Sequence, residues 1–126
     1  MRIGKYGKYK SKEYKVADEI AGNVELVSKD TEDLNNGFTR YERAPSIFIK
    51  TVRKEELEYF VKIIPYAIID DEKFEIIGIG DNSVVIFTYD ETIAKKHSME
   101  RTGIHEYKKN VSIKGLKTVE EKILLD

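Results

Sequence analysis

The chain has 126 residues, of which 40% are hydrophobic and 36% are charged, and its formal net charge at pH 7 is −1. This composition predicts a soluble globular protein and excludes a general attraction to nucleic acid or to an anionic membrane, which needs a concentrated positive field. Because the sequence has no cysteine, disulfides, thiolate nucleophiles and cysteine-ligated zinc are excluded as well.

The sequence contains no segment that is apolar over a membrane-spanning length. The first ten residues lack the apolar core of a signal peptide, and the longest apolar run, residues 63–69, is too short to cross a bilayer. The absence of cysteine fits a reducing compartment. We therefore expect a cytoplasmic protein that does not bind a membrane.

Residues 13–30, EYKVADEIAGNVELVSKD, predict a β-hairpin. Its two halves are rich in aromatic and β-branched side chains, and the Ala-Gly-Asn between them tolerates the positive φ of a tight turn. Asp30 then begins a polar segment that ends at Gly37, a pattern typical of a short helix with an aspartate N-cap and a glycine C-cap. Three further strands are expected, at residues 38–42, 47–52 and 59–64.

The second half of the chain repeats this layout. Residues 73–90, KFEIIGIGDNSVVIFTYD, are a near-copy of the first hairpin, and strands are expected again around Arg101, at residues 107–111 and at residues 119–124. A shift of 60 positions aligns Tyr14 with Phe74, Val16 with Ile76, Val24 with Val84, Leu26 with Ile86 and Asp30 with Asp90. A shift of 59 aligns Phe48 with Tyr107, Lys50 with Lys109 and Val52 with Val111.

The repeat predicts an all-β protein with short helical turns, made of two tandem small barrels over residues 1–63 and 64–126. Units of about 60 residues are near the lower limit for burying a core alone, so we expect them to share an interface. Pro65 cannot donate to a strand ladder, which places the crossing between the units at Ile63-Ile64-Pro65.

The order of five short strands with a helical turn before the fourth resembles the Src-homology-3-like (SH3-like) small barrel. The acidic loop with paired tryptophans and the proline-tyrosine pair of the peptide-binding proteins are missing, and the chain has no tryptophan. The resemblance therefore implies the fold class but not polyproline binding.

A second resemblance is to Bacillus-type immunity proteins, which are encoded beside secreted polymorphic toxins. The shared layout is carried by Tyr9, Glu13-Tyr14, Asp30, Gly37-Phe38 and Ile49-Lys50-Thr51-Val52. The second copy departs from it, with Ser98-Met99 in place of Gly37-Phe38. The resemblance implies a protein that binds a toxin and occludes it.

No pattern in the sequence points to catalysis, a cofactor or a metal. Asp70-Asp71-Glu72 are consecutive, so their side chains diverge rather than converge on one ion, and a solvated turn is favoured. His97 and His105 lack the spacing of a zinc site, and no glycine-rich phosphate loop follows a strand. We predict a protein that is not an enzyme; a small hydrolase is the third alternative.

The leading hypothesis is a non-catalytic protein-binding module, and specifically an immunity protein. Clustered carboxylates suit a basic cleft in a partner, and tyrosines suit a protein interface because they combine large contact area with a hydrogen bond. Core packing and helix-start acids are the competing interpretation of the same residues. The predicted contacts are Asp30, Glu32, Asp33, Tyr41, Glu55, Glu56, Tyr89 and Tyr107.

The alternative hypothesis is binding of nucleic acid by the amino-terminal strip, where lysines alternate with tyrosines as on single-strand-binding surfaces. The strip consists of Lys5, Tyr6, Lys8, Tyr9 and Lys10. The acidic residues that follow oppose a phosphate track. We therefore favour lysines that protect an outer strand from further pairing, with tyrosines that fill the core.

Overall fold

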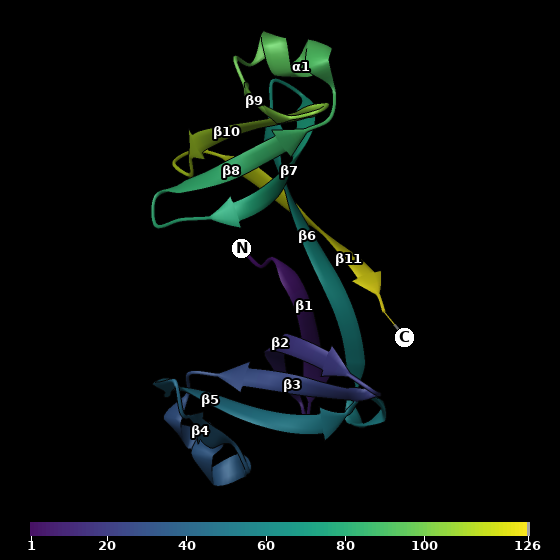
Figure 1. Cartoon of the computed structure of the whole chain (residues 1–126), viewed down its shortest axis with the longest axis vertical. Helices are drawn as coiled ribbons and strands as arrows, with labels where there is room; N and C mark the ends of the chain where they lie inside the picture. Colours follow the sequence, from purple (N-terminus) through teal and green to yellow (C-terminus); the bar gives the residue numbers. More distant parts are fainter. Residues whose placement is uncertain (126) are drawn as a thin grey trace. The chain divides into compact units, whose positions relative to one another are not determined.

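The structure is a computed structural model that describes residues 1–125. These residues are mostly β-strand with short helical turns, and neighbouring strands are hydrogen-bonded in an antiparallel arrangement (Figure 1). The prediction of a mainly β protein with short helical turns is confirmed. No helix among the described residues is long and apolar enough to cross a membrane.

The chain divides into two compact units. Residues 4–63 and 122–125 form the unit that we call the amino-terminal unit, and residues 1–3 and 64–121 form the carboxy-terminal unit. The first and last residues thus belong to the unit built mainly from the other half of the chain.

The amino-terminal unit has the strand order β4-β5-β3-β2-β1-β6. Its elements are β1 (Gly4–Tyr9), β2 (Lys12–Ile20), β3 (Asn23–Ser28), the 3-10 helix η1 (Thr31–Asn36), β4 (Thr39–Tyr41), β5 (Ala44–Arg53), the 3-10 turn η2 (Lys54–Glu56) and the first residues of β6 (Tyr59–Ile69).

The carboxy-terminal unit continues from β6 in the order β6-β7-β8-β10-β9, and β11 also pairs with β6. Its further elements are β7 (Glu72–Ile79), β8 (Ser83–Thr88), the helix α1 (Glu91–Lys96), β9 (Glu100–Gly103), β10 (Glu106–Ser112) and β11 (Lys117–Leu124).

The strand pairings of the two units follow the offsets of the sequence repeat. Val24 on β3 lies opposite Val52 on β5, and Val84 on β8 lies opposite Val111 on β10. The first hairpin has a register shift between Val16 and Asp18, and the second has one between Ile76 and Gly78. The bulges are therefore also 60 residues apart.

Turns and helix starts agree with the local sequence. The β1–β2 turn holds Lys10 and Ser11 at φ 47° and 68°, and the β6–β7 turn holds Asp70 and Asp71 at φ 51° and 65°, the consecutive left-handed residues of a type I′ hairpin. η1 and α1 each begin at the aspartate expected from the sequence. Asp30 accepts a hydrogen bond from the backbone N–H of Glu32, and Asp90 accepts from Thr92 and Ile93.

Each unit has its own buried apolar cluster, formed mainly by the inward side chains of its strands. In the amino-terminal unit the cluster contains Tyr9, Tyr14, Val16, Val24, Leu26, Phe38, Phe48, Val52, Leu57 and Phe60. In the carboxy-terminal unit it contains Ala67, Phe74, Ile76, Val84 and Ile86.

Two expectations about strands are wrong. The closing strand of the first half does not end at Ile64: β6 runs through Pro65, pairing with β1 up to Ile63 and with β7 from Tyr66. Pro65 fits because it lies between these two registers, where its missing N–H breaks neither ladder. The lysine-rich β1 is not an outer strand either, since it pairs with both β2 and β6.

Candidate functional site

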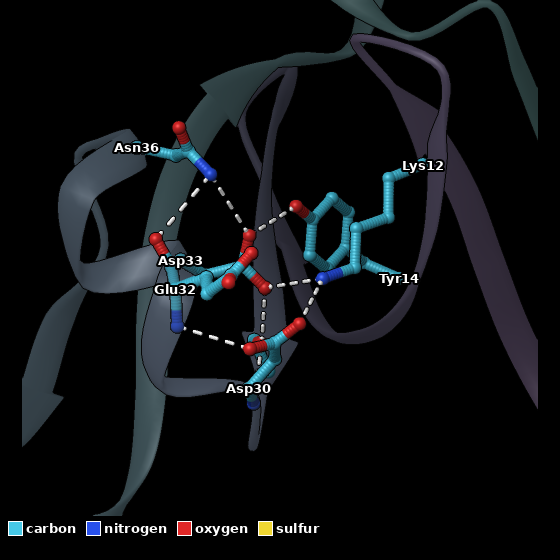
Figure 2. Close-up of polar contacts among 7 residues, drawn as sticks. Lys12, Tyr14, Asp30, Glu32, Asp33 and Asn36 are labelled. Atoms are coloured by element: carbon cyan, nitrogen blue, oxygen red, sulfur yellow. Dashed lines mark hydrogen bonds and ion pairs between the residues drawn. The ribbon is translucent and has the colours of Figure 1, made fainter.

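The most polar buried cluster in the amino-terminal unit surrounds Asp33, whose side chain is 1% exposed. One carboxylate oxygen accepts from the Tyr14 hydroxyl (2.8 Å) and from the Asn36 amide (3.3 Å), and the other accepts from the Ser28 hydroxyl (2.5 Å) and the Lys12 ammonium (2.9 Å). Figure 2 shows most of this Asp33 network, defined as these five residues.

The network ties three elements together. Lys12 and Tyr14 are two residues apart on β2, Ser28 ends β3, and Asp33 and Asn36 lie on η1. Lys12 also bonds Asp30, the N-cap of η1, at 2.9 Å. The helix is thereby held against the first hairpin by charge-assisted hydrogen bonds.

The electrostatics of the network fix its protonation states. Burial alone would raise the pKa of Asp33, but hydrogen bonds from Ser28, Lys12 and Tyr14 outweigh it and lower that pKa to about 2. Burial and the hydrogen bond to Asp33 raise the pKa of Tyr14 to about 12, and hydrogen bonds to Asp33 and Asp30 hold the pKa of Lys12 well above its ordinary value. None of these three shifts brings a proton-exchanging group toward neutral pH, so the network suits a structural role better than general acid–base catalysis.

We expect this network to shape the pH dependence of stability. Asp33 has a lower pKa folded than unfolded (about 3.8), so its contribution is complete above pH 4 and is lost as the pH falls toward 2. Tyr14 has a higher pKa folded than unfolded (about 10), so its contribution holds below pH 10 and is lost as the pH rises through 12. The midpoint of urea unfolding, measured from pH 2 to 12, should fall both at the acid end and at the alkaline end of this range. An Asp33→Asn variant whose midpoint falls in parallel with that of the wild type at the acid end would contradict the assignment.

The equivalent position in the carboxy-terminal unit lacks this network and has an acidic residue where the first unit has Lys12. Phe74 and Ile93 stand where the first unit has Tyr14 and Asp33, so neither the hydroxyl nor the carboxylate is present. Glu72, the counterpart of Lys12, instead accepts from the Lys96 ammonium at 2.6 Å and lies 3.2 Å from Nε2 of His97. The two units therefore fasten the helical turn to the hairpin with reversed charges.

A second feature of the amino-terminal unit is a hollow on the outward face of the sheet. Its volume is about 250 Å³, and we call it the outer hollow. Val27 and Ile49, directly opposite each other on β3 and β5, form part of its floor. Its lining is mainly apolar and comprises Ala17, Glu25, Val27, Tyr41, Ile47 and Ile49.

The predicted protein contacts are divided between the two units. In the amino-terminal unit, Asp30 and Glu32 lie at the exposed start of η1, Glu55 and Glu56 lie on η2, and Tyr41 lines the outer hollow, while Asp33 is buried. In the carboxy-terminal unit, Tyr89 is 68% exposed and Tyr107 is buried. Burial removes Asp33 and Tyr107 from the surface that a partner could touch.

The amino-terminal lysine and tyrosine strip is not one continuous surface, because successive side chains of β1 point to opposite faces. Tyr9 is buried in the core, with the Lys10 ammonium 5.4 Å from its ring centre. Tyr6 and Lys8 lie on the other face, and Lys5 pairs with Glu19 at 3.6 Å.

The outer hollow was missed by the sequence interpretation, although the sequence holds a signal for it. Ile47-Phe48-Ile49 on β5 are three consecutive apolar residues, whereas a strand with one solvated face alternates. Phe48 fills the core, so the isoleucines on either side face outward. Among residues 1–125, by contrast, no group of three or more histidine, aspartate and glutamate side chains is placed to hold a metal ion.

No curated protein and no solved structure is significantly similar to the chain. Residues 1–126, the full sequence, match the family described as Uncharacterised conserved protein UCP033725. The match covers both units and therefore includes the Asp33 network and the outer hollow. The chain belongs to this family.

Proposed function

We propose that the chain is a non-catalytic protein-binding module, and specifically a bacterial cytoplasmic immunity protein that occludes a cognate toxin domain. The observation that carries the proposal is the outer hollow. One face of the sheet is buried in the core, and the hollow lies on the opposite face. Its apolar residues Val27, Ile47 and Ile49 are therefore in contact with water. A partner's apolar side chain would remove that surface from water.

The proposed fold is a tandem pair of SH3-like small barrels. Support comes from the five-strand layout with a helical turn before the fourth strand, and from the bulges and aspartate N-caps that recur 60 residues later. This fold class hosts many functions, so it carries no activity by itself. Binding rather than catalysis is favoured because the polar groups of the Asp33 network are fully engaged with one another.

The proposal is tested with the toxin domain that a neighbouring gene is expected to encode, at the carboxy terminus of a large secreted protein. Co-expression of the chain should restore growth, and the purified proteins should form a complex measurable by calorimetry. The Ile49→Lys variant should lower the affinity at least about tenfold, because the lysine side chain would occupy the hollow and bring a charge to the place where the partner's apolar side chain packs.

Lysine is a suitable change because the corresponding position on β10 is Lys108, opposite Phe87. Asn35→Lys, which adds the same charge on the exposed surface of η1, is the matched control. Absence of a toxin gene beside the chain, or a complex that Ile49→Lys leaves intact, would count against this function. Salt-dependent retention on single-stranded RNA that is lost in Lys8→Glu would favour the nucleic-acid alternative.

A further inference from the structure

One carboxylate, that of Glu25, borders the outer hollow, and a second one lies beside it. Asp18 on β2 and Glu25 on β3 are directly opposite each other, and Glu25 borders both the outer hollow and a smaller depression of about 80 Å³. That depression is lined by Asp18, Ile20, Asn23, Val24, Glu25 and Thr51.

A bulge brings both carboxylates to the outward face. Val16 and Leu26 are paired and buried, and the register then shifts so that Asp18, rather than Ala17, lies opposite Glu25. In a bulge two residues of one strand face a single residue of the other. Ala17 and Asp18 therefore both border the outward depressions.

The carboxylate pair is unfavourable for folding. Like charges directly opposite each other on antiparallel strands destabilise the sheet, and neither Asp18 nor Glu25 forms an ion pair within residues 1–125. Asp18 accepts only a hydrogen bond from the neighbouring N–H of Glu19, at 2.8 Å. Lys15 lies on the same face, opposite Val27, and pairs with neither carboxylate.

The carboxy-terminal unit shows that the fold does not need these acids. It has the same bulge, with Gly78 opposite Val85 where the first unit has Asp18 opposite Glu25. A Cβ atom added to Gly78 would lie 3.4 Å from Cγ2 of Val85, so the two positions are close enough to act on one group. An acidic pair that the bulge does not require, beside an apolar hollow, indicates recognition of a cation.

We propose that Asp18 and Glu25 bind an arginine side chain of a partner protein, while an apolar side chain next to that arginine fills the outer hollow. The planar guanidinium has donors on several edges and can bond both carboxylates at once. Binding relieves the repulsion between the two acids, and the exposed Ile20 beside them would shield the contact from water. The inference rests on the proposed protein-binding function and specifies arginine as the residue of the partner that the site recognises.

The probes are three capped peptides, acetyl-Leu-Arg-Phe-amide and its counterparts with lysine or glutamate in the middle position, titrated into the ¹⁵N-labelled full chain. We expect shifts confined to residues 15–27 and 39–51. The arginine peptide should bind at least fivefold more tightly than the lysine peptide, and the glutamate peptide should not bind. The Asp18→Asn and Glu25→Gln double variant should lose at least 80% of the affinity while its Tm equals or exceeds that of the wild type.

Equal affinities for the arginine and glutamate peptides, or shifts centred elsewhere, would overturn the inference. Toxin-domain binding distinguishes the two proposals. A complex that is sensitive to Ile49→Lys but unaffected by the Asp18 and Glu25 changes would overturn the arginine contact and leave the binding function standing. If the arginine peptide causes selective shifts but the chain neutralises no neighbouring toxin, the arginine site would stand and the immunity function would be overturned.

Discussion

Replacing Asp33 with alanine is expected to lower the free energy of unfolding of the amino-terminal unit by about 2–4 kcal/mol, since the buried hydroxyls of Tyr14 and Ser28 lose their acceptor. The change removes the acceptor shared by four side chains and leaves the Tyr14 hydroxyl, which is largely buried, without its partner. Lys12 keeps its bond to Asp30, so the loss should come mainly from the buried groups. Urea titration followed by circular dichroism measures the change.

The carboxy-terminal unit supplies the matched control for this prediction. Phe74 and Ile93 occupy the positions that correspond to Tyr14 and Asp33. A double variant with Tyr14→Phe and Asp33→Ile therefore copies a pair of residues that the chain already uses. Because apolar groups replace both the donor and the acceptor, the double variant should lose less than half as much stability as Asp33→Ala. A double variant as unstable as the alanine variant would show that the network is not the source of the loss.

The second large effect is expected from Phe74→Ala in the carboxy-terminal unit. Phe74 is fully buried among Ala67, Ile76, Val84 and Ile86, and removal of its ring should cost about 3–5 kcal/mol through lost burial and the remaining cavity. Native-state hydrogen exchange should show faster opening of β7, β8 and β10, because each unit has a separate core.

Phe48→Ala is the reciprocal variant, since Phe48 occupies the core of the amino-terminal unit. It should speed exchange in β2, β3 and β5 instead. If either substitution accelerates exchange equally in both units, the two cores do not open separately and the prediction is wrong.

Local features of the fold could be predicted from the sequence because each is encoded by adjacent residues. The aromatic and β-branched side chains of residues 13–20 mark β2, and the short run from Asp30 to Gly37 contains both the N-cap and the left-handed C-cap of η1. The offset of 59 between Val52 and Val111 likewise predicted which residues of β5 and β10 correspond.

The chemistry between elements could not be predicted in the same way. Lys12 and Asp33 are 21 positions apart and meet only because the helix folds back on the hairpin, so the sequence pattern alone predicts Asp33 as a partner contact. The pairing of Asp18 with Glu25 depends on the bulge at Ala17, since without the extra residue Ala17 would face Glu25 instead. Such register shifts have no strong sequence signal when the residue concerned is alanine.

Each end of the chain belongs to the unit built mainly from the other half of the sequence, and this limits how the protein can be cut into fragments. Leu125 packs against the amino-terminal core, and its N–H donates to the carbonyl of Phe60 at 3.0 Å, so a fragment that stops at Ile63 lacks part of its own fold. A fragment that starts at Ile64 lacks residues 1–3, including Arg2, which bonds Glu120. The two halves of the sequence therefore do not coincide with the two structural units. To isolate one unit, the terminal segment that it lacks would have to be fused to it.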